Sequence, residues 1–119
     1  ETEVLTKDNT TMTLSMAFNY GGRAELVDAV KEIARSGVKP DKIDERLIRR
    51  HLYDPSMPDP ELMVRTSGEH RISNFLLWEI AYSELVFTDV LWPDFRRSDL
   101  YSAIDEFQQR ERRFGGLNG

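Results

Sequence analysis

The sequence alternates between strand-like and helix-like hydrophobic patterns, with no two-residue hairpin turn between them. Apolar and polar side chains alternate along residues 11–19, which predicts a strand. Short apolar runs at residues 61–66 and 85–90 predict two more strands. Because strands that alternate with helices are joined by crossover connections, they form a parallel sheet. We therefore predict an α/β fold, a parallel sheet flanked by helices.

Helical periodicity fills the segments between these strands. The predicted helices span about residues 23–37, 41–52, 73–83 and 98–114. Residues 54–60 contain three prolines, which predicts a rigid surface crossing. Three parallel strands are few for a sheet that is normally covered on both faces. We therefore expect the chain to be one piece of a longer protein that supplies further strands, as its first residue, Glu1, also suggests.

Composition argues against several classes of function. The chain has 119 residues, enough for one domain, and a net charge of −5, which argues against nucleic-acid binding. It has no cysteine, so disulfides and thiolate metal sites are excluded, and a reducing cytoplasm is compatible. The longest apolar run is far shorter than the roughly 20 residues of a membrane-spanning helix, and no signal peptide is predicted.

The stretch 65–74, read as R-T-S-G-E-H-R-I-S-N, lies between a predicted strand and a predicted helix. A glycine lets the backbone approach a ligand, a helix N-terminus offers free N–H groups, and arginines supply forked donors. Two guanidiniums and a hydroxyl, from Arg65, Arg71 and Ser73, match the many acceptor oxygens of a diphosphate. The stretch therefore predicts a diphosphate site, and a solvated loop whose arginines pair with nearby glutamates is the alternative.

Two glutamates and a histidine belong to the same hypothesis. In the solvated-loop alternative, Glu69 and Glu84 pair with the arginines. In the diphosphate hypothesis, a carboxylate beside the phosphates needs a bridging hard cation such as Mg²⁺. Glu84, which ends the predicted 73–83 helix, is then a candidate ligand, and an exposed glutamate is the alternative. His70 is a candidate for contacting the phosphates or the water shell of the metal, and simple exposure is again the alternative.

The stretch N-Y-G-G-R at residues 19–23 also places glycines and an arginine after a predicted strand. It lacks the full spacing of a dinucleotide or P-loop motif. It favours a tight strand-to-helix turn, with Gly21 or Gly22 at positive φ. Further along, a dense set of large aromatic side chains is typical of a protein core or an interface rather than a ligand site, and its density suits a subunit contact. This set is Trp78, Tyr82, Phe87, Trp92 and Phe95.

Three blocks of the sequence resemble the C-terminal half of the cis-prenyltransferases, the undecaprenyl diphosphate synthase family. They are N-Y-G-G-R at 19–23, R-T-S-G-E-H-R-I-S-N-F-L-L-W at 65–78 and Y-S-E-L-V-F-T-D-V-L-W-P-D-F at 82–95. The similarity covers about residues 9 to 116. The resemblance implies an α/β homodimer built around a parallel sheet. It also implies a (Z)-polyprenyl diphosphate synthase, which condenses isopentenyl diphosphate with an allylic diphosphate and releases diphosphate.

The resemblance implies roles for individual residues by their positions in these motifs. The residues that would bind isopentenyl diphosphate are Arg65, Arg71, Ile72 and Ser73. Glu84 would be a Mg²⁺ ligand. Arg113 and Gly115 resemble the family's terminal R-x-G element, which approaches the diphosphate across the dimer interface. The enzyme so implied is cytoplasmic, with peripheral membrane association through its lipid product.

The chain departs from the family pattern chiefly in what it lacks. Glu61 stands where the family usually has aspartate, and Glu79 where glutamine is common; both changes retain polarity. No D-G-N-x-R-W-like stretch is present, although the family's first half carries the aspartate that manages Mg²⁺ and the allylic diphosphate. We therefore expect residues 1–119 to be the C-terminal portion of a single catalytic domain, inactive on its own. The alternative is a non-catalytic accessory subunit of a heterodimeric prenyltransferase, against which the intact substrate and metal set argues.

Overall fold

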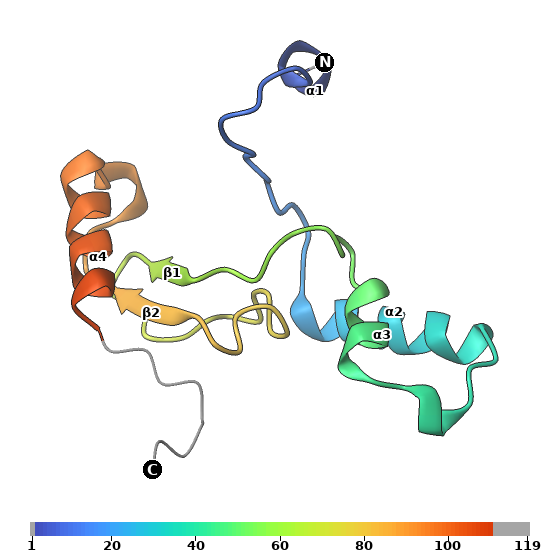
Figure 1. Ribbon diagram of the computed structural model, residues 1–119. Coiled ribbons are helices and arrows are strands. Elements are labelled where there is room, and N and C mark those ends of the chain that lie inside the picture. Colours follow the sequence, from blue (N-terminus) through green and yellow to red (C-terminus); the bar gives the residue numbers. More distant parts are fainter. Residues whose placement is uncertain (1, 111–119) are drawn as a thin grey trace.

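A computed structural model describes residues 2–110 of the chain (Figure 1). Its α-helices are α1 (Thr2–Thr6), α2 (Gly22–Arg35), α3 (Glu45–Arg50) and α4 (Arg97–Gln109). Its 3₁₀ helices are η1 (Pro40–Lys42) and η2 (Trp92–Asp94), and its strands are β1 (Leu62–Arg65) and β2 (Glu84–Phe87). In this part of the chain no helix is both long enough and apolar enough to cross a membrane.

The two strands are parallel, which confirms the predicted α/β class. Leu62 lies opposite Glu84, and Arg65 lies opposite Phe87. The pairing continues at both ends, because the Glu84 amide donates to the Glu61 carbonyl at 2.9 Å and the Thr88 amide to the Arg65 carbonyl at 2.9 Å. Helix α4 packs against β2, where Val86 and Ala103 are buried. The sheet and α4 therefore form one layered unit.

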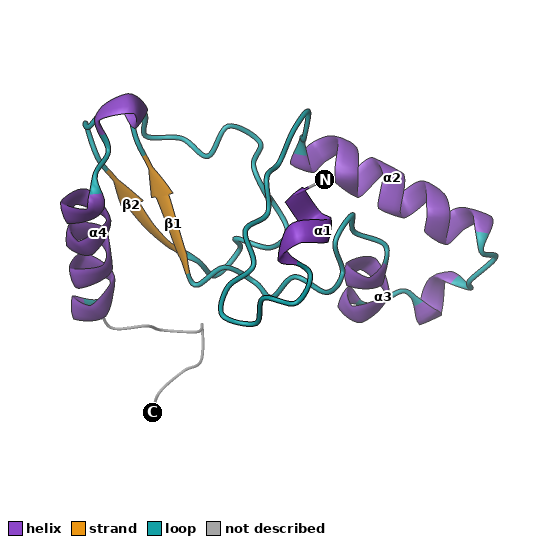
Figure 2. Cartoon of the chain, turned by 90° about the horizontal axis from the view of Figure 1, so that it is seen from above, coloured by secondary structure: helices purple, strands orange, loops and turns teal. Residues whose placement is uncertain are grey.

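A second packed unit lies at the other end of the molecule. Figures 1 and 2 show α2 and α3 side by side, away from the sheet and α4. Its apolar centre contains the buried side chains of Ala29, Ile33 and Leu52. The connection between β1 and β2, residues 66–83, reaches this unit, because the Gly22 amide at the start of α2 donates to the Asn74 carbonyl at 2.7 Å.

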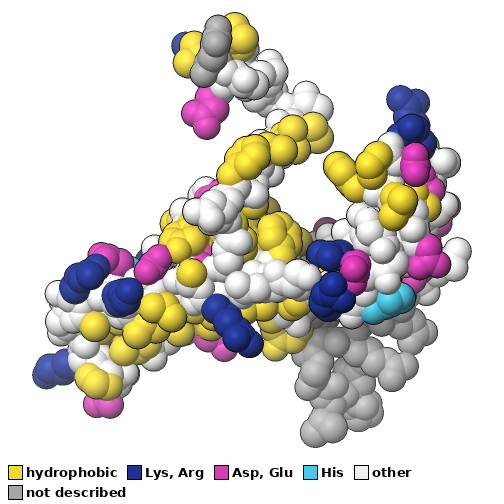
Figure 3. Space-filling view, turned by 180° about the vertical axis from the view of Figure 1, so that it is seen from behind, with side chains coloured by type: hydrophobic (Ala, Val, Ile, Leu, Met, Phe, Trp, Pro, Cys, Tyr) yellow, Lys and Arg dark blue, Asp and Glu magenta, His cyan; other side chains and the backbone are white. Residues whose placement is uncertain are grey.

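The strand predicted at residues 11–19 is wrong for this structure, in which the segment has no regular secondary structure. Met12 is 76% exposed and Phe18 is 81% exposed. Figure 3 shows hydrophobic side chains along this segment as it leads away from the body of the molecule. An alternating pattern determines which side chains would share a face, but a strand also needs a neighbour to supply its hydrogen bonds. Among residues 2–110, only β1 and β2 supply such bonds to each other.

The helix predicted at residues 73–83 is also wrong, because the segment is a series of turns. Ser73, Asn74 and Leu76 have φ values of 49°, 64° and 45°. A right-handed helix requires negative φ, so these residues prevent a continuous helix. Isolated turn bonds remain, such as the one from the Ile80 amide to the Leu76 carbonyl at 3.0 Å. Glu84 therefore does not end a helix but begins β2.

The remaining helices differ from prediction mainly at their ends. The segment predicted as one helix at 41–52 is divided into η1 and α3, and Asp44 rather than Asp41 caps α3 by accepting from the Leu47 amide at 2.8 Å. Helix α4 begins at Arg97, one residue before the predicted start. The backbone leaves the helix at Arg110, where φ is −83° and ψ is 137°. The end predicted near residue 114 lies outside the described residues.

Candidate functional site

The loop that follows β1 is hydrogen-bonded to the segment that follows β2. Arg65, the last residue of β1, lies at the carboxyl edge of the sheet, where parallel α/β proteins usually bind ligands. The Ser67 amide donates to the Val90 carbonyl at 2.8 Å and the Gly68 amide to the Thr88 carbonyl at 3.0 Å. A Cβ at Gly68, whose φ is +68°, would lie 3.2 Å from the Asp89 carboxylate. The loop is therefore fixed where a ligand would be expected.

His70 is placed by an aromatic contact. Its ring centroid lies 5.2 Å from that of Phe87, with the rings tilted by 32°. Phe87 is also the partner of Arg65 in the strand register. The structure thus brings His70 and Arg65 to the same end of the strands, although His70 itself is exposed.

Arg71 forms the ion pair that the solvated-loop alternative predicts. Its guanidinium lies 2.5 Å from the Glu69 carboxylate, and its side chain is 66% exposed. Glu84, by contrast, pairs with Arg110 rather than with an arginine of the loop. Within residues 2–110, the side chains of Arg65 and Arg71 share no bonding partner. The structure therefore places the two arginines in one loop region without joining them.

A pocket of about 350 Å³ lies where the two glycine-containing motifs meet. It is lined by Arg23, Ile72, Asn74 and Leu77. Ile72 is one of the predicted substrate-binding residues, and Ser73, exposed, lies between two of the lining residues. Arg23, at the end of N-Y-G-G-R, was not among the predicted site residues. Its only sequence signal was its position after two glycines, which favoured a tight turn.

Gly21 and Gly22 of N-Y-G-G-R have negative φ, and they are needed because neighbouring atoms pack closely against them. Gly21 has φ of −148°, and Asn19, at φ 49°, takes the left-handed conformation instead. A Cβ at Gly22 would lie 2.7 Å from Cγ of Leu77. The predicted positive φ at Gly21 or Gly22 is therefore wrong, because the space beside them, not their backbone angle, requires glycine.

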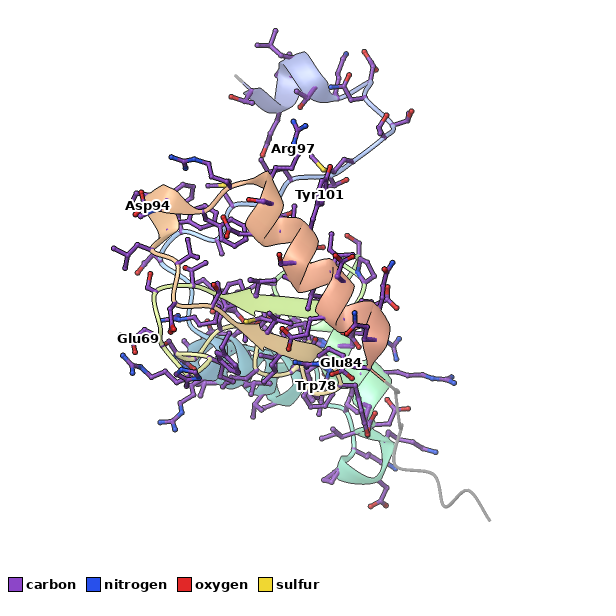
Figure 4. All side chains as sticks on the ribbon, turned by 90° about the vertical axis from the view of Figure 1, so that its left-hand side faces the viewer. Glu69, Trp78, Glu84, Asp94, Arg97 and Tyr101 are labelled. Carbon is purple, nitrogen blue, oxygen red and sulfur yellow. The ribbon has the colours of Figure 1, made fainter. Side chains whose placement is uncertain are left out.

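Glu84 is the first residue of β2, so it lies at the amino ends of the strands, whereas Arg65 lies at their carboxyl ends. The two residues are three register positions apart on neighbouring strands, which corresponds to about 10 Å along the strand direction. Its Oε2 accepts from the Arg110 guanidinium at 3.0 Å, and Arg110 also donates to the Leu85 carbonyl at 2.8 Å. The hydrogen bonds to the Glu84 and Glu106 carboxylates raise the pKa of Arg110 above its ordinary value. Figure 4 shows Glu69 and Glu84 apart, with the strands between them.

A buried acidic cluster lies between α2 and the turns that precede β2. Glu25 and Glu79 are only 2% and 4% exposed. Glu25 accepts from the Tyr20 hydroxyl and from the Tyr53 amide, the latter at 2.9 Å. Burial raises the pKa of Glu79, and the Glu25 and Asp59 carboxylates raise it further. Sequence reasoning did not predict this cluster; its one signal was a glutamate at position 79, where glutamine is common in the resembled family.

Two predicted site residues, Arg113 and Gly115, lie outside the described residues. The site that the structure describes is therefore the loop after β1, the adjoining pocket and the separate Glu84 edge. Arg65, Arg71 and Arg23 border this loop and pocket, which also carry hydroxyl and amide groups, and all of these groups are able to donate hydrogen bonds to an anion.

Comparison with known proteins places this arrangement in a family. A family model described as putative undecaprenyl diphosphate synthase matches residues 1–115. Isoprenyl transferase 2 of Corynebacterium glutamicum is 54% identical over 117 residues, a match that covers 95% of this chain and 48% of that protein. A tritrans,polycis-undecaprenyl-diphosphate synthase (geranylgeranyl-diphosphate specific) of Pyrococcus horikoshii is 55% identical over 119 residues, covering 97% of this chain and 45% of that protein.

A solved structure shows the same fold. The lavandulyl diphosphate synthase of Lavandula x intermedia, in complex with dimethylallyl diphosphate, superposes with a TM-score of 0.89 at 38% identity. The match covers 96% of this chain and 51% of that one. The chain thus spans about half the length of the curated relatives and of the solved structure that it matches.

Proposed function

Because the chain belongs to the undecaprenyl diphosphate synthase family, we propose that it is the C-terminal portion of a single cis-prenyltransferase catalytic domain. The proposed activity is (Z)-polyprenyl diphosphate synthesis, the condensation of isopentenyl diphosphate with an allylic diphosphate. The observation that carries the proposal is the family match over residues 1–115, which includes the whole loop after β1. A cytoplasmic enzyme that meets the membrane through its lipid product is part of the same proposal.

We place isopentenyl diphosphate at the loop after β1, bound by Arg65, Arg71, Ile72 and Ser73. Arg71 supports this role because its ion pair with Glu69 is exposed to solvent and therefore weak. An exposed ion pair contributes about 0.2–1 kcal/mol, whereas a charge-assisted hydrogen bond to a phosphate contributes about 1.5–3 kcal/mol. A diphosphate can therefore displace Glu69 from Arg71. Arg65 and His70 then flank the bound anion from the end of the strands.

These groups would act by orientation and by charge. Holding the diphosphate fixes the isopentenyl double bond relative to the allylic carbon, which removes much of the entropic barrier. The guanidinium groups would also offset the charge of the bound isopentenyl diphosphate, which keeps its own diphosphate; the group that departs is the diphosphate of the allylic substrate. Arg113 and Gly115 are proposed to reach the same diphosphate across a homodimer interface.

Mg²⁺ is the cofactor we propose, with Glu84 as its protein ligand. A carboxylate is the kind of oxygen ligand that Mg²⁺ takes. Glu84 is bound by Arg110 through Oε2, and no group of three metal-ligating side chains gathers within residues 2–110. Glu84 also lies about 10 Å along the strands from Arg65, so as described it does not reach a diphosphate at the loop after β1. If Glu84 were freed from Arg110, the ion would take its other ligands from diphosphate oxygens and water, as sites with one or two carboxylates do, and would supply positive charge to offset that of the diphosphate.

The full-length protein tests this proposal. We expect Z-configured polyprenyl diphosphate from isopentenyl and allylic diphosphates, and we expect Arg71→Ala to raise KM for isopentenyl diphosphate or lower kcat by about 10- to 100-fold, the equivalent of ~1.5–3 kcal/mol. Arg97→Ala, which removes an exposed arginine at the start of α4, is the matched control (Figure 4). Its kinetics should equal those of the wild type.

Three results would contradict the proposal in different ways. Unchanged kinetics in Arg71→Ala would remove the loop from the substrate site. Turnover of dimethylallyl diphosphate alone, without isopentenyl diphosphate, would indicate a different condensation. Failure of the full-length protein to bind isopentenyl diphosphate by titration calorimetry would favour the non-catalytic accessory subunit.

A further inference from the structure

Asn74 caps helix α2 from a distant part of the sequence. Its backbone carbonyl accepts from the Gly22 amide at 2.7 Å, and its side-chain Oδ1 accepts from the Arg23 amide at 2.9 Å. Gly21, which precedes the helix, has no side chain that could cap it. The first amides of a helix have no partner inside the helix, so a cap is normally supplied by the residue just before it. Here a residue 51 positions away supplies it.

The same residue lies in a backbone conformation that needs external support. Ser73, Asn74 and Leu76 account for three of the five non-glycine residues with positive φ in the part of the chain that the structure describes. Such conformations are costly for residues with a side chain and persist where surrounding contacts hold them. The two hydrogen bonds to α2 are contacts of this kind, because together they fix both the peptide group and the side chain of Asn74.

The glycines of N-Y-G-G-R complete the arrangement from the other side. A Cβ at Gly21 would lie 2.9 Å from Nδ2 of Asn74, and a Cβ at Gly22 would lie 3.1 Å from its carbonyl oxygen. Glycine at both positions therefore leaves room for Asn74 to approach α2 this closely. The pocket lined by Arg23, Ile72 and Asn74 lies at this junction.

We propose that Asn74 is a positioning residue that ties the substrate loop to the start of α2. It acts through its neighbours: by bonding Gly22 and Arg23, it holds Ile72 and Ser73 in place for the diphosphate of isopentenyl diphosphate. This inference rests on the function proposed above. It makes the two separated motifs, N-Y-G-G-R and R-I-S-N, parts of one structural unit.

Two substitutions separate the cap from the backbone conformation. Asn74→Gly removes Oδ1 but adopts positive φ without strain and keeps the carbonyl that binds Gly22. Asn74→Ala removes Oδ1 and also strains the backbone. If the side-chain cap positions the loop, both variants of the full-length enzyme should raise KM for isopentenyl diphosphate, by about tenfold for Asn74→Gly, because small misplacements of a bound group cost up to ~100-fold. KM for the allylic diphosphate should change less than about twofold.

Two further variants complete the design. Asp44→Gly is the matched control, because it likewise removes a side-chain helix cap, the one that accepts from the Leu47 amide at 2.8 Å at the start of α3, and Asp44 is not part of the proposed site. Its KM values should match the wild type. Gly21→Ala leaves residue 74 unchanged but intrudes on its side-chain amide, and it should reproduce the rise in KM for isopentenyl diphosphate. Amide hydrogen exchange gives a separate readout: Arg23 should lose protection in Asn74→Gly, whereas Gly22 should retain it.

The outcomes are distinguishable. Wild-type KM for isopentenyl diphosphate in Asn74→Gly would overturn the inference, and so would an equal rise for both substrates, since a general loss of structure would produce it. A lower melting temperature with unchanged KM would show that the cap serves stability alone. An inactive wild-type enzyme would overturn the proposed function, and the positioning role would fall with it.

Discussion

The buried carboxyl group of Glu79 is an unusual element of this structure. Its Oε2 has no hydrogen-bond partner among the described residues, and Glu25, equally buried, carries a second carboxylate nearby. An unpaired charge in such a place is costly, so the neutral form is favoured and the pKa of Glu79 is raised above its ordinary value of 4.5. Glutamine, which resembles the neutral carboxyl group in shape, would avoid the cost of keeping the proton.

Glu79→Gln should therefore stabilise the full-length protein increasingly as pH rises. Below the ordinary pKa of 4.5, Glu79 is protonated in the folded and unfolded states, so the wild type incurs no penalty. Above it, the unfolded state releases the proton first, and the free energy of unfolding falls as pH rises through the raised folded pKa. Glu79→Gln has no such ionisation, so its free energy of unfolding does not fall in this way. At neutral pH it should exceed that of the wild type by about 1 kcal/mol, the lower range for an unsatisfied buried polar group.

Chemical denaturation between pH 4 and pH 8 would measure this difference. Glu45→Gln, which changes an exposed glutamate in the first turn of α3, is the matched control and should show no such growth with pH. An advantage of Glu79→Gln that is constant with pH, or that shrinks as pH rises, would contradict the role of ionisation.

At the scale of elements, hydrophobic patterns predicted α2, both strands and the start of α4 to within a few residues, because each of these elements has a neighbour to pack against. The same patterns failed at residues 11–19 and 73–83. In the first, alternation does not say whether a neighbouring strand is present. In the second, the backbone angles are determined by long-range contacts with α2, which helical periodicity does not contain.

For the candidate site, too, one part could be predicted from the sequence and another could not. Its residue types could be read from the sequence, because guanidinium, hydroxyl and carboxylate groups near a glycine indicate diphosphate chemistry. Its arrangement could not. The sequence offers no signal that Arg23 lies beside Ile72, or that Glu84 lies at the far edge of the sheet and pairs with Arg110. Such placements depend on which elements pack together.

The contact between α2 and the turns before β2 is testable at Gly22. A Cβ there would lie 2.7 Å from Cγ of Leu77 and 3.0 Å from its backbone nitrogen, so the backbone itself must shift. Gly22→Ala should lower the free energy of unfolding by about 1–3 kcal/mol, the usual cost of overpacking. Leu77→Ala removes the side-chain contact but not the backbone one, so the double variant should recover part of this loss.

A double-mutant cycle measured by urea denaturation gives the coupling between the two positions. Gly37→Asn is the matched control, because a Cβ at Gly37 meets nothing within 4 Å and asparagine tolerates its φ of +71°. It should change stability by less than about 0.5 kcal/mol. Additive effects of Gly22→Ala and Leu77→Ala would show that the two residues are not in contact.

At the scale of the whole molecule, the chain buries little apolar surface for its length. Its radius of gyration is 17.4 Å, whereas a compact domain of the same length has about 13.5 Å. The alternating side chains of Met12, Leu14, Met16 and Phe18 are each at least 66% exposed. An apolar strip of this kind usually marks a surface that another part of a protein covers.

This arrangement predicts that the 119-residue chain alone shows no turnover with isopentenyl diphosphate and farnesyl or geranyl diphosphate, whereas the full-length protein is active under the same conditions. The physical reason is twofold. The sequence has no counterpart of the family's allylic-diphosphate motif, and a two-stranded sheet with an exposed apolar segment is a weak support for the loop after β1. Incorporation of radiolabelled isopentenyl diphosphate measures activity, and a dye that binds apolar surface should fluoresce more with the isolated chain. Product formation by that chain would mean that residues 1–119 contain a complete catalytic site.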